Sequence, residues 1–422
     1  LKLEPLPATL TGAEGRAPDP ILDANSTYSK LDERILLGFG GVSEYGITVR
    51  WDKNFLTLTY LALARNPNVR MYGGIRFGGT MLLEDAWELG FDHVAIAAGA
   101  GRPTLIDIKN NLARGMRKAS DFLMALQLTG AYKRTSIANL QISLPAIVIG
   151  GGLTAIDTAT ELLAYYLVQI EKTLERWQSL EKSLTSAELA RLFDDEEMRQ
   201  MQEHVAHGRE LLAEREAAKR EGREPNVQAL LAKWGGVTLV YRKSLQESPA
   251  YRLNHEEVAK SLEEGVRYVE NLAPTDAVVD ERGRVTAMRF GRRDGSSVEL
   301  PAKTVCVAAG TSPNVTYERE HPGTFELDKR GQYFKAHEAV SVDGKVILKP
   351  ADTPAAGFFT SYQNAAGNTV SFYGDNHPFY AGSVVKAMAS AKDGYAHVAA
   401  LFPEIRALDR AAQPARDEKR RA

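Results

Sequence analysis

Hydrophobic residues along this chain alternate between short continuous runs and helical spacing. The apolar runs His93–Ala98, Ala146–Ile149 and Val237–Tyr241 predict buried strands. Helical spacing at Leu83–Leu89 and Ile156–Leu167 predicts helices between them. This alternation is typical of an α/β fold with parallel strands.

Further elements extend the pattern on both sides. The predicted helices are Asn54–Asn66 and a segment that opens at Gly382, and the predicted strands are Val69–Tyr72, Tyr268–Leu272, Asp276–Asp280, Val285–Phe290, Thr304–Ala308 and a run from Val370. Glu281-Arg-Gly283 supplies a turn between two of these strands, so we expect a β-hairpin there.

The segment between the helix at Thr154 and the strand at Val237 is far longer than an ordinary connection. Glu171–Leu184 and Glu188–Glu221 are dense in Glu, Lys, Arg, Leu and Ala, which favours helix. We therefore predict an inserted antiparallel helical hairpin at about residues 168–232.

A capping box supports the second helix of this insertion, because Thr185 and Glu188 have the spacing in which each side chain binds the other's backbone N–H. Two interpretations of the insertion remain open. It is either an arm that docks a partner or a solvated decoration held by its own intrahelical charge pairs, and the second is favoured.

Composition narrows the class of protein. With 422 residues, 44% of them hydrophobic, the chain exceeds the size of one core, so two domains are expected. A net charge of −2 gives no sign of the excess positive charge that nucleic-acid-binding proteins carry. Mean hydropathy of −0.28 and the lack of an apolar run near 18 residues argue against a membrane span. The single cysteine, Cys306, lies in a predicted strand and is expected to serve core packing.

The two ends of the chain carry little pattern. Residues 1–30 are rich in Pro and Ala and read as loop, and residues 403–422 form a charged tail. The N-terminus has neither a signal pattern nor an initiator Met, which fits a cytoplasmic protein and also a chain that starts part-way through a longer one.

A glycine-rich turn is the strongest chemical signal. The strand at Ala146 breaks on three glycines and continues as a helix, the arrangement of a dinucleotide-binding turn. The first glycine permits a tight turn, the third lets backbone approach a pyrophosphate, and small Ala155 allows close packing of helix on strand. The predicted binding residues are Gly150, Gly151, Gly152, Leu153 and Thr154.

The end of the next strand indicates which nucleotide binds. An NAD site places Asp or Glu there for the ribose hydroxyls, whereas a 2′-phosphate requires cations. This chain has Arg242 and Lys243, so we expect NADPH. The alternative is that both residues are solvated surface cations.

Two distant segments resemble each other. Asp92–Pro103 and Lys303–Asn314 each contain a strand, Ala-Ala-Gly and a proline turn. Such a pair suits the two places where a chain crosses between nucleotide-binding domains, since glycine lets backbone pass beside a cofactor. The predicted cofactor contacts are Ala98, Gly99, Ala309 and Gly310.

A strand followed by Gly374-Asp375 lies near the C-terminus, and a helix follows it. An acid at that position can bind a polyol chain, and the helix start at Gly382, Ser383 and Val384 offers N–H groups to an electron-rich ring edge such as that of a flavin. The alternative is that Asp375 and Ser383 only cap a helix. His377 beside them is expected to be a loop residue rather than a catalyst.

Taken together, these motifs resemble the two-dinucleotide flavoprotein superfamily, and most closely the small (beta) subunit of NADPH-dependent glutamate synthase, over about residues 38–402. Gly40–Ile47, with Gly40, Gly41 and Gly46, looks like that family's loop beside the flavin. The two Ala-Ala-Gly strands look like its crossovers, and Glu247–Ala250 looks like part of its NADPH site.

The resemblance implies that a hydride passes from NADPH to FAD and that electrons leave through an iron–sulfur domain or subunit. The cofactor carries such chemistry, so no catalytic side chain and no protein-bound metal are expected, and the sequence shows no competing triad, metal cluster or Walker loop.

Two family features are missing. No strand with GxGxxG precedes Gly40, and there is no cysteine-rich electron-transfer domain. We therefore expect a fragment of a longer polypeptide that lacks the half-site for the FAD diphosphate. The implied organisation is an incomplete FAD domain at 1–110 and 301–402, an NADPH domain at 111–300 between them, and the tail from 403.

Two other functions remain open. One is a non-catalytic nucleotide-binding or docking module. The other is an enzyme of the ferredoxin–NADP reductase type, which uses similar motifs with a different electron partner.

Overall fold

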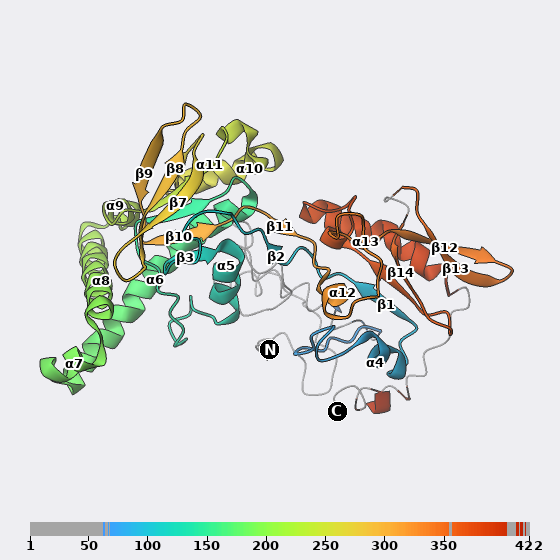
Figure 1. Cartoon of the computed structure of the whole chain (residues 1–422). Helices are drawn as coiled ribbons and strands as arrows, with labels where there is room; N and C mark the ends of the chain where they lie inside the picture. Colours follow the sequence, from blue (N-terminus) through green and yellow to red (C-terminus); the bar gives the residue numbers. More distant parts are fainter. Residues whose placement is uncertain are drawn as a thin grey trace. The chain divides into compact units, whose positions relative to one another are not determined.

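The computed structural model describes residues 68–353 and 357–402, with a few further positions within 62–66 and 411–418. The chain divides into two compact units (Figure 1). One comprises Met71–Arg102 and the described residues from Thr311 onward, and the other comprises Pro103–Gly310 together with the described residues up to Arg70. The two connecting segments, β2 (Arg102–Pro103) and β11 (Thr311–Ser312), pair as a two-stranded sheet.

These results confirm the predicted fold class, an α/β chain in which one Rossmann-like unit is inserted between two segments of another. The changeovers lie at 102/103 and 310/311 rather than near 110 and 300. The reason is packing, since Ile106, Ile108 and Val305 all belong to the core of the inserted unit.

The inserted unit is built on a parallel sheet with strand order β3-β10-β4-β5-β6. Helices cover one face of this sheet and a three-stranded antiparallel sheet, β7-β8-β9, packs on the other. The bounds are β3 Met116–Lys118, α5 Ala119–Leu128, β4 Ala146–Ile149, α6 Leu153–Ser183, α7 Ser186–Leu192, α8 Asp195–Glu221, α9 Val227–Lys233, β5 Val237–Val240, η3 Leu245–Glu247, α10 Pro249–Leu253, α11 His255–Glu263, β6 Arg267–Val269, β7 Ala273–Val279, β8 Val285–Gly291, β9 Ser297–Pro301 and β10 Thr304–Val307.

Strand β4 shows why this sheet is hydrophobic on both sides. Ala146 and Val148 pack into the helical layer, whereas Ile147 and Ile149 pack against the antiparallel sheet. A parallel strand covered on both faces needs a continuous apolar run, which is what its sequence has. Cys306 of β10 is fully buried, and burial raises the pKa of its thiol to about 12, in agreement with a packing role.

The other unit contains a mixed sheet with strand order β1-β15-β14-β12-β13, in which β1 and β15 are parallel. An aromatic core lies against one face, and α13 contacts Phe358 and Tyr373 through Gly394. The bounds are α4 Leu83–Glu88, β1 His93–Ile96, α12 Thr316–Glu320, β12 His337–Val342, β13 Lys345–Pro350, β14 Phe359–Gln363, β15 Thr369–Phe372, η4 Gly374–Asn376 and α13 Val384–Ala399.

Most predicted elements within the described residues are present, and two predictions were wrong or partly wrong. Val69–Tyr72 is not a strand, since it pairs with no strand of the described residues. Only the first part of Tyr268–Leu272 is in β6. The predicted helix at 54–66 lies almost wholly outside the described residues.

The inserted helices also differ from the expected hairpin. The first is continuous with the helix of the glycine turn, since α6 runs for 31 residues. The Thr185–Glu188 capping box is confirmed, but it starts the short helix α7, and Asp194 with Glu197 forms a second box that starts α8. Sequence reasoning overlooked this second box, which breaks the predicted helix at Phe193.

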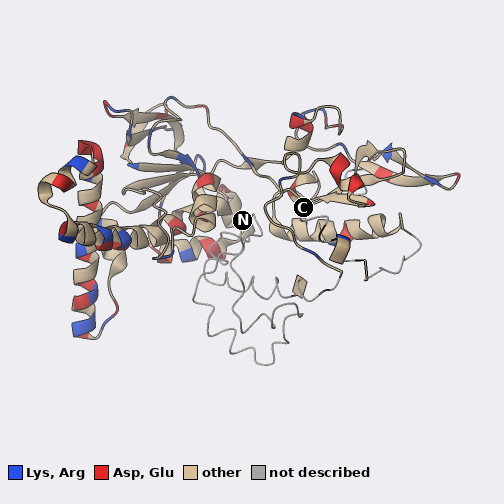
Figure 2. Ribbon diagram, turned by 90° about the horizontal axis from the view of Figure 1, so that it is seen from below, with Lys and Arg blue, Asp and Glu red and all other residues tan. Residues whose placement is uncertain are grey.

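Two acidic residues of α8, Glu196 and Glu203, bind other elements of its unit. Glu196 is nearly buried and lies 2.9 Å from a guanidinium nitrogen of Arg114 and 3.1 Å from one of Arg284. Further along, Lys303 pairs with Glu203 at 2.5 Å. Figure 2 shows how densely both signs of charge decorate these helices. Neither interpretation of the insertion anticipated these links between elements.

Close approach of α8 to α6 requires a glycine. A Cβ on Gly208 would lie 2.9 Å from the carbonyl oxygen of Ile170 and 3.0 Å from Cβ of Leu174. Beside this contact, His204 is 3% exposed and its Nε2 donates to the carbonyl of Ile142 at 3.0 Å.

Replacing Gly208 with alanine should destabilise the chain, although alanine favours helix. The helix propensity gain of about 1 kcal/mol is expected to be outweighed by steric overlap, for a net loss of about 1–3 kcal/mol. Urea unfolding measures the difference, with Ala206→Gly on the exposed face of α8 as the control for propensity alone. A more stable Gly208→Ala variant would contradict the packing.

His204 should make stability depend on pH. Burial lowers the pKa of this imidazole from 6.5 to about 4, so on acidification the unfolded chain takes up the proton first. The free energy of unfolding should therefore fall as pH drops below about 6.5, level off below about 4, and lose up to about 3 kcal/mol through this group. Urea unfolding of wild type and His204→Gln across this range tests it, with exposed His255→Gln as control. Equal pH dependence in all three would contradict the assignment.

Candidate functional site: a glycine turn and two strand edges

The three glycines after β4 have different surroundings. A Cβ on Gly150 would lie 2.4 Å from the carbonyl oxygen of Ala308, and one on Gly151 would lie 2.4 Å from the ring of Tyr241. A Cβ on Gly152 would meet nothing within 4 Å. The first two glycines are therefore required by the chain's own packing, and the third leaves a backbone surface that a ligand can approach.

The helix after this turn presents its positive end to the same surface. Gly152 is the N-cap of α6, and the first turn contains no acidic residue. The N–H groups of Leu153 and Thr154 donate to no other described residue. Ala155 is fully buried, as expected for close packing of helix on strand. Free N–H groups and the helix dipole together favour an anion such as a phosphate.

The position of the turn in the sheet also suits a ligand. Gly150 donates its N–H to the carbonyl of Val240 at 3.0 Å, and Ala308 donates to that of Ile149 at 2.7 Å. The turn thus lies at the carboxyl edge between neighbouring strands. From β4 the chain proceeds through α6 to β5 on one side, whereas β10 lies on the other side. In open α/β sheets, ligands bind where the strand order reverses in this way.

Cations follow the adjacent strand on the same edge. Arg242 and Lys243 come after β5 and are exposed. Arg242 forms no ion pair with a described residue, whereas Lys243 Nζ lies 3.6 Å from a carboxylate oxygen of Glu247.

The segment after these cations is attached to the glycine turn. Ser248 caps α10 by accepting the N–H of Tyr251, and Pro249 occupies its first turn. Ala250 then donates its N–H to the carbonyl of Gly151 at 3.0 Å. The Ser-Pro-Ala sequence could have indicated the helix start, but the bond to Gly151 depends on the fold.

In the other unit, a second set of predicted residues gathers at the carboxyl edge of β1 and β15. Ile96 pairs with Phe372 where these strands end. Beyond them, Gly99 adopts φ +66° and accepts the N–H of Asn314 at 2.9 Å, and Gly374 adopts φ +64°. Ala98 is exposed and precedes Gly99 in the same loop.

Polar groups in this second set satisfy backbone N–H groups. Asp375 Oδ1 accepts the N–H of Gly382 at 2.9 Å, and Ser383 caps α13 by accepting that of Lys386 at 3.3 Å. Val384, the first residue of α13, is half exposed. Helix capping therefore accounts for Ser383 and for one carboxylate oxygen of Asp375. The other oxygen of Asp375 forms no hydrogen bond with a described residue and can accept one from a ligand.

His377 has a structural role. It is fully buried, its Nε2 donates to the carbonyl of Gly357 at 2.8 Å, and its Nδ1 accepts the N–H of Phe379 at 3.3 Å. Both ring nitrogens are thus engaged, as a loop-fixing residue requires and a proton-transfer residue does not.

The structure therefore brings the predicted residues together in two groups, one in each unit. Ala309 and Gly310 are exposed in the segment after β10, where the carbonyl of Gly310 accepts the N–H of Thr104 at 2.9 Å. Gly40, Gly41 and Gly46 lie outside the described residues.

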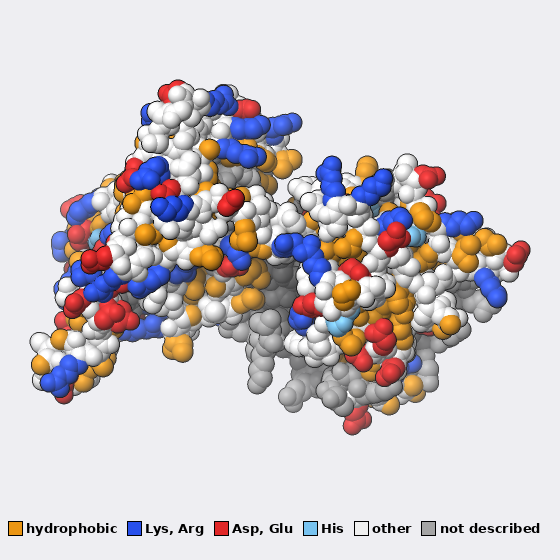
Figure 3. Space-filling view, in the orientation of Figure 1, with side chains coloured by type: hydrophobic (Ala, Val, Ile, Leu, Met, Phe, Trp, Pro, Cys, Tyr) orange, Lys and Arg blue, Asp and Glu red, His pale blue; other side chains and the backbone are white. Residues whose placement is uncertain are grey.

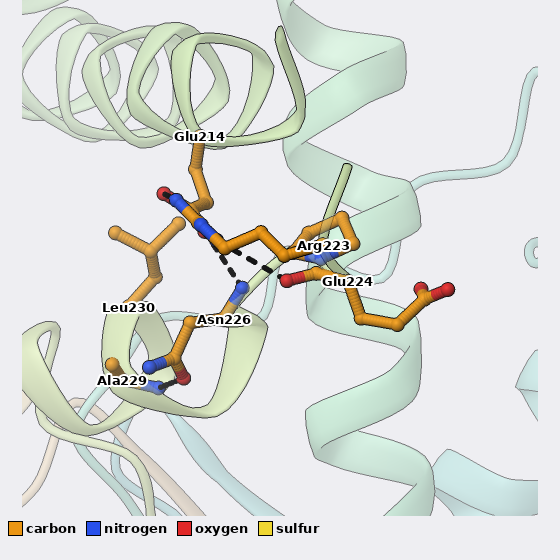
Figure 4. A pocket seen from close by; sticks show the side chains of 7 residues that line it. Glu214, Arg223, Glu224, Asn226, Ala229 and Leu230 are labelled. Atoms are coloured by element: carbon orange, nitrogen blue, oxygen red, sulfur yellow. Dashed lines mark hydrogen bonds and ion pairs between the residues drawn. The ribbon is translucent and has the colours of Figure 1, made fainter. Parts of the chain in front are cut away.

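A cavity of about 590 Å³ lies elsewhere, where α8 meets α9 (Figure 4). Its walls include Glu214 and Arg223, whose side chains point toward each other and bond at 2.6 Å. Hydrogen bonds from Arg223 and from the N–H of Asn226 lower the pKa of Glu214 to about 2. This cluster joins the end of α8 to the start of α9, and none of the predicted binding residues lines the cavity.

In the described part of the chain, no three His, Cys, Asp or Glu side chains are placed to share a metal ion. None of its helices combines the length and apolarity that a bilayer crossing needs.

No protein-family model matches the chain. An uncharacterised protein of Rickettsia prowazekii, RP006, is 37% identical over 365 residues, which cover 86% of this chain and 45% of that protein. The chain thus spans slightly less than half of this relative. The solved structure of FprA from Mycobacterium tuberculosis, a His57Gln mutant, has a similar fold, with a TM-score of 0.50 and 16% identity over 93% of this chain and 85% of that one.

Replacing Gly152 with valine should separate ligand binding from folding. The Cβ of the new side chain has no protein atom within 4 Å, so the free energy of unfolding should change by less than about 1 kcal/mol. A bound pyrophosphate would be blocked, and NADPH affinity should fall more than about tenfold. Calorimetric titration and thermal unfolding measure the two quantities. Gly151→Ala is the contrasting variant, expected to lose stability because of Tyr241. Unchanged NADPH affinity in Gly152→Val would contradict the ligand site.

Proposed function

We propose that this chain is an NADPH-dependent flavin oxidoreductase module, in which the inserted unit binds NADPH and the other unit contributes part of an FAD site. The observation that carries the proposal is the glycine turn. Its backbone is open at Gly152, two of its N–H groups donate to no other described residue, and Arg242 on the same sheet edge forms no ion pair with a described residue. The similarity in fold to FprA, an oxidoreductase, supports the same class of function.

A 2′-phosphate explains the charge at the end of β5. An NAD site needs a carboxylate there to accept hydrogen bonds from the ribose hydroxyls, and this position is occupied by Arg242 and Lys243. A phosphate instead gains charge-assisted hydrogen bonds from such cations. NADPH is therefore preferred to NADH.

The FAD contacts proposed for the other unit are Ala98, Gly99, Gly374, Asp375, Gly382, Ser383 and Val384, with Ala309 and Gly310 from the second crossover strand. Asp375 would accept a ribityl hydroxyl, and the start of α13 would face the pyrimidine edge of the flavin. Gly40, Gly41 and Gly46 remain contacts proposed from the family resemblance.

The protein's own residues bind, orient and exclude water, and no side chain is proposed as a catalyst. FAD, when bound, supplies the chemistry of accepting a hydride from the nicotinamide and releasing electrons one at a time. We propose an iron–sulfur domain or subunit as the electron acceptor, in the manner of the glutamate synthase small subunit. A ferredoxin–NADP reductase type of enzyme is the alternative that shares the same two nucleotide sites.

The test is the visible spectrum of the purified chain after incubation with FAD and gel filtration, before and after anaerobic NADPH. Retained flavin bands that bleach on addition of NADPH, and bleach more slowly with NADH, are the expected result. Flavin that stays oxidised although calorimetry shows bound NADPH would favour a non-catalytic nucleotide-binding module. Absence of NADPH binding would overturn the proposal.

A further inference from the structure

The neighbourhood of Arg242 includes a second element that sequence order does not suggest. The carbonyl of Tyr241 accepts the N–H of Leu272 at 3.2 Å, and that of Lys243 accepts the N–H of Asn271 at 3.1 Å. The end of β5 therefore runs beside the residues that lead into β7.

Strand β7 brings the turn between β8 and β9 to the same place. Ala273, the first residue of β7, pairs with Gly291, the last residue of β8. Arg292 and Arg293 follow directly and are both exposed. Two backbone contacts thus connect Lys243 with this turn: its hydrogen bond with Asn271, and the pairing of Ala273 with Gly291. In Figure 3, Lys and Arg side chains gather on the face between the β8–β9 turn and α10.

Glu247, four residues after Lys243, responds to charges from two elements. Hydrogen bonds from Ser244 lower the pKa of this carboxyl, and the charges of Lys243 and Arg293 lower it further. Both charges therefore act on Glu247, one from the segment after β5 and one from the β8–β9 turn. Its Oε1 is 3.6 Å from Lys243 Nζ, and Arg293 forms no ion pair with a described residue.

Arg292 has a different environment. The charge of Arg292 acts on Asp294 within its own turn, where hydrogen bonds from Ser296 are the main cause of a lowered pKa. Asp294 thus provides Arg292 with a local counter-charge. The two neighbouring arginines therefore form a natural pair of test and control.

We infer that Arg293, from the β8–β9 turn, is a third cation for the nucleotide 2′-phosphate beside Arg242 and Lys243, and that Glu247 is the counter-charge that the phosphate displaces. This assignment rests on the proposed NADPH site. The preference for NADPH over NADH would then depend partly on the β8–β9 turn, about 50 residues downstream of the end of β5. In dinucleotide-binding folds this preference is usually set at the strand end itself. A phosphate bound by several cations gains charge-assisted bonds that NADH cannot make.

The experiment is calorimetric titration of the whole chain with NADPH and with NADH at low salt. Arg293→Gln should weaken NADPH binding about tenfold and leave NADH binding within about twofold. Arg292→Gln should change neither by more than about twofold, and Arg242→Gln serves as the positive reference.

Glu247→Gln gives an independent test in the opposite direction. Glutamine can still complete the capping box with Ser244, but a negative charge near the phosphate is removed. NADPH binding should tighten about two- to fivefold with no change for NADH. Thermal unfolding verifies that each variant is folded.

The outcomes separate the two proposals. If wild type binds NADPH but Arg293→Gln behaves like Arg292→Gln, the role of Arg293 is overturned and the NADPH site stands. If Arg293→Gln weakens the binding of NADPH and of NADH equally, Arg293 does not recognise the 2′-phosphate, and the inference is overturned. If wild type binds neither nucleotide, both proposals fail.

Discussion

The inserted unit depends on how closely β10 approaches the turn after β4. Gly150 has no side chain, and for that reason the carbonyl oxygen of Ala308 can lie only 2.4 Å from the position that a Cβ would occupy. This contact fixes the carboxyl edge of the parallel sheet, and with it the direction in which α6 leaves. It also places the crossover segment that follows β10 beside the glycine turn. An ordinary side chain at this position would force strand and turn apart, and the open surface at Gly152 would lose its shape.

The two edges of the sheet use charge in opposite ways. At the amino edge, Glu196 is nearly buried among arginines and Lys303 pairs with Glu203, so that α8 is held by charges that are already balanced. At the carboxyl edge, Arg242 has no partner among the described residues, and the first turn of α6 has no acid. Paired charges at the amino edge therefore hold the unit together. The positive charge at the carboxyl edge, where we propose an anionic ligand, is not fully balanced among the described residues.

The sequence predicted much of this architecture, since continuous apolar runs and a glycine turn are local signals. The parallel strands β4, β5 and β10, the start of α6 and the β7–β8 hairpin were all predicted. What failed depended on other parts of the chain. Val69–Tyr72 lacks a pairing strand among the described residues. The charges of α8 find partners on elements that no sequence spacing connects. The relation of Arg293 to Lys243 likewise arises only because Ala273 pairs with Gly291.

The most direct test of the central claim is hydrogen–deuterium exchange of the wild-type chain with and without NADPH. The amides of Gly151–Thr154 are predicted to gain protection, because a bound phosphate would accept from N–H groups that donate to no described residue in the free chain. Segments at 242–247 and 291–296 should become protected with them. Protection confined to other segments, or a pattern that NADH reproduces in full, would contradict the account.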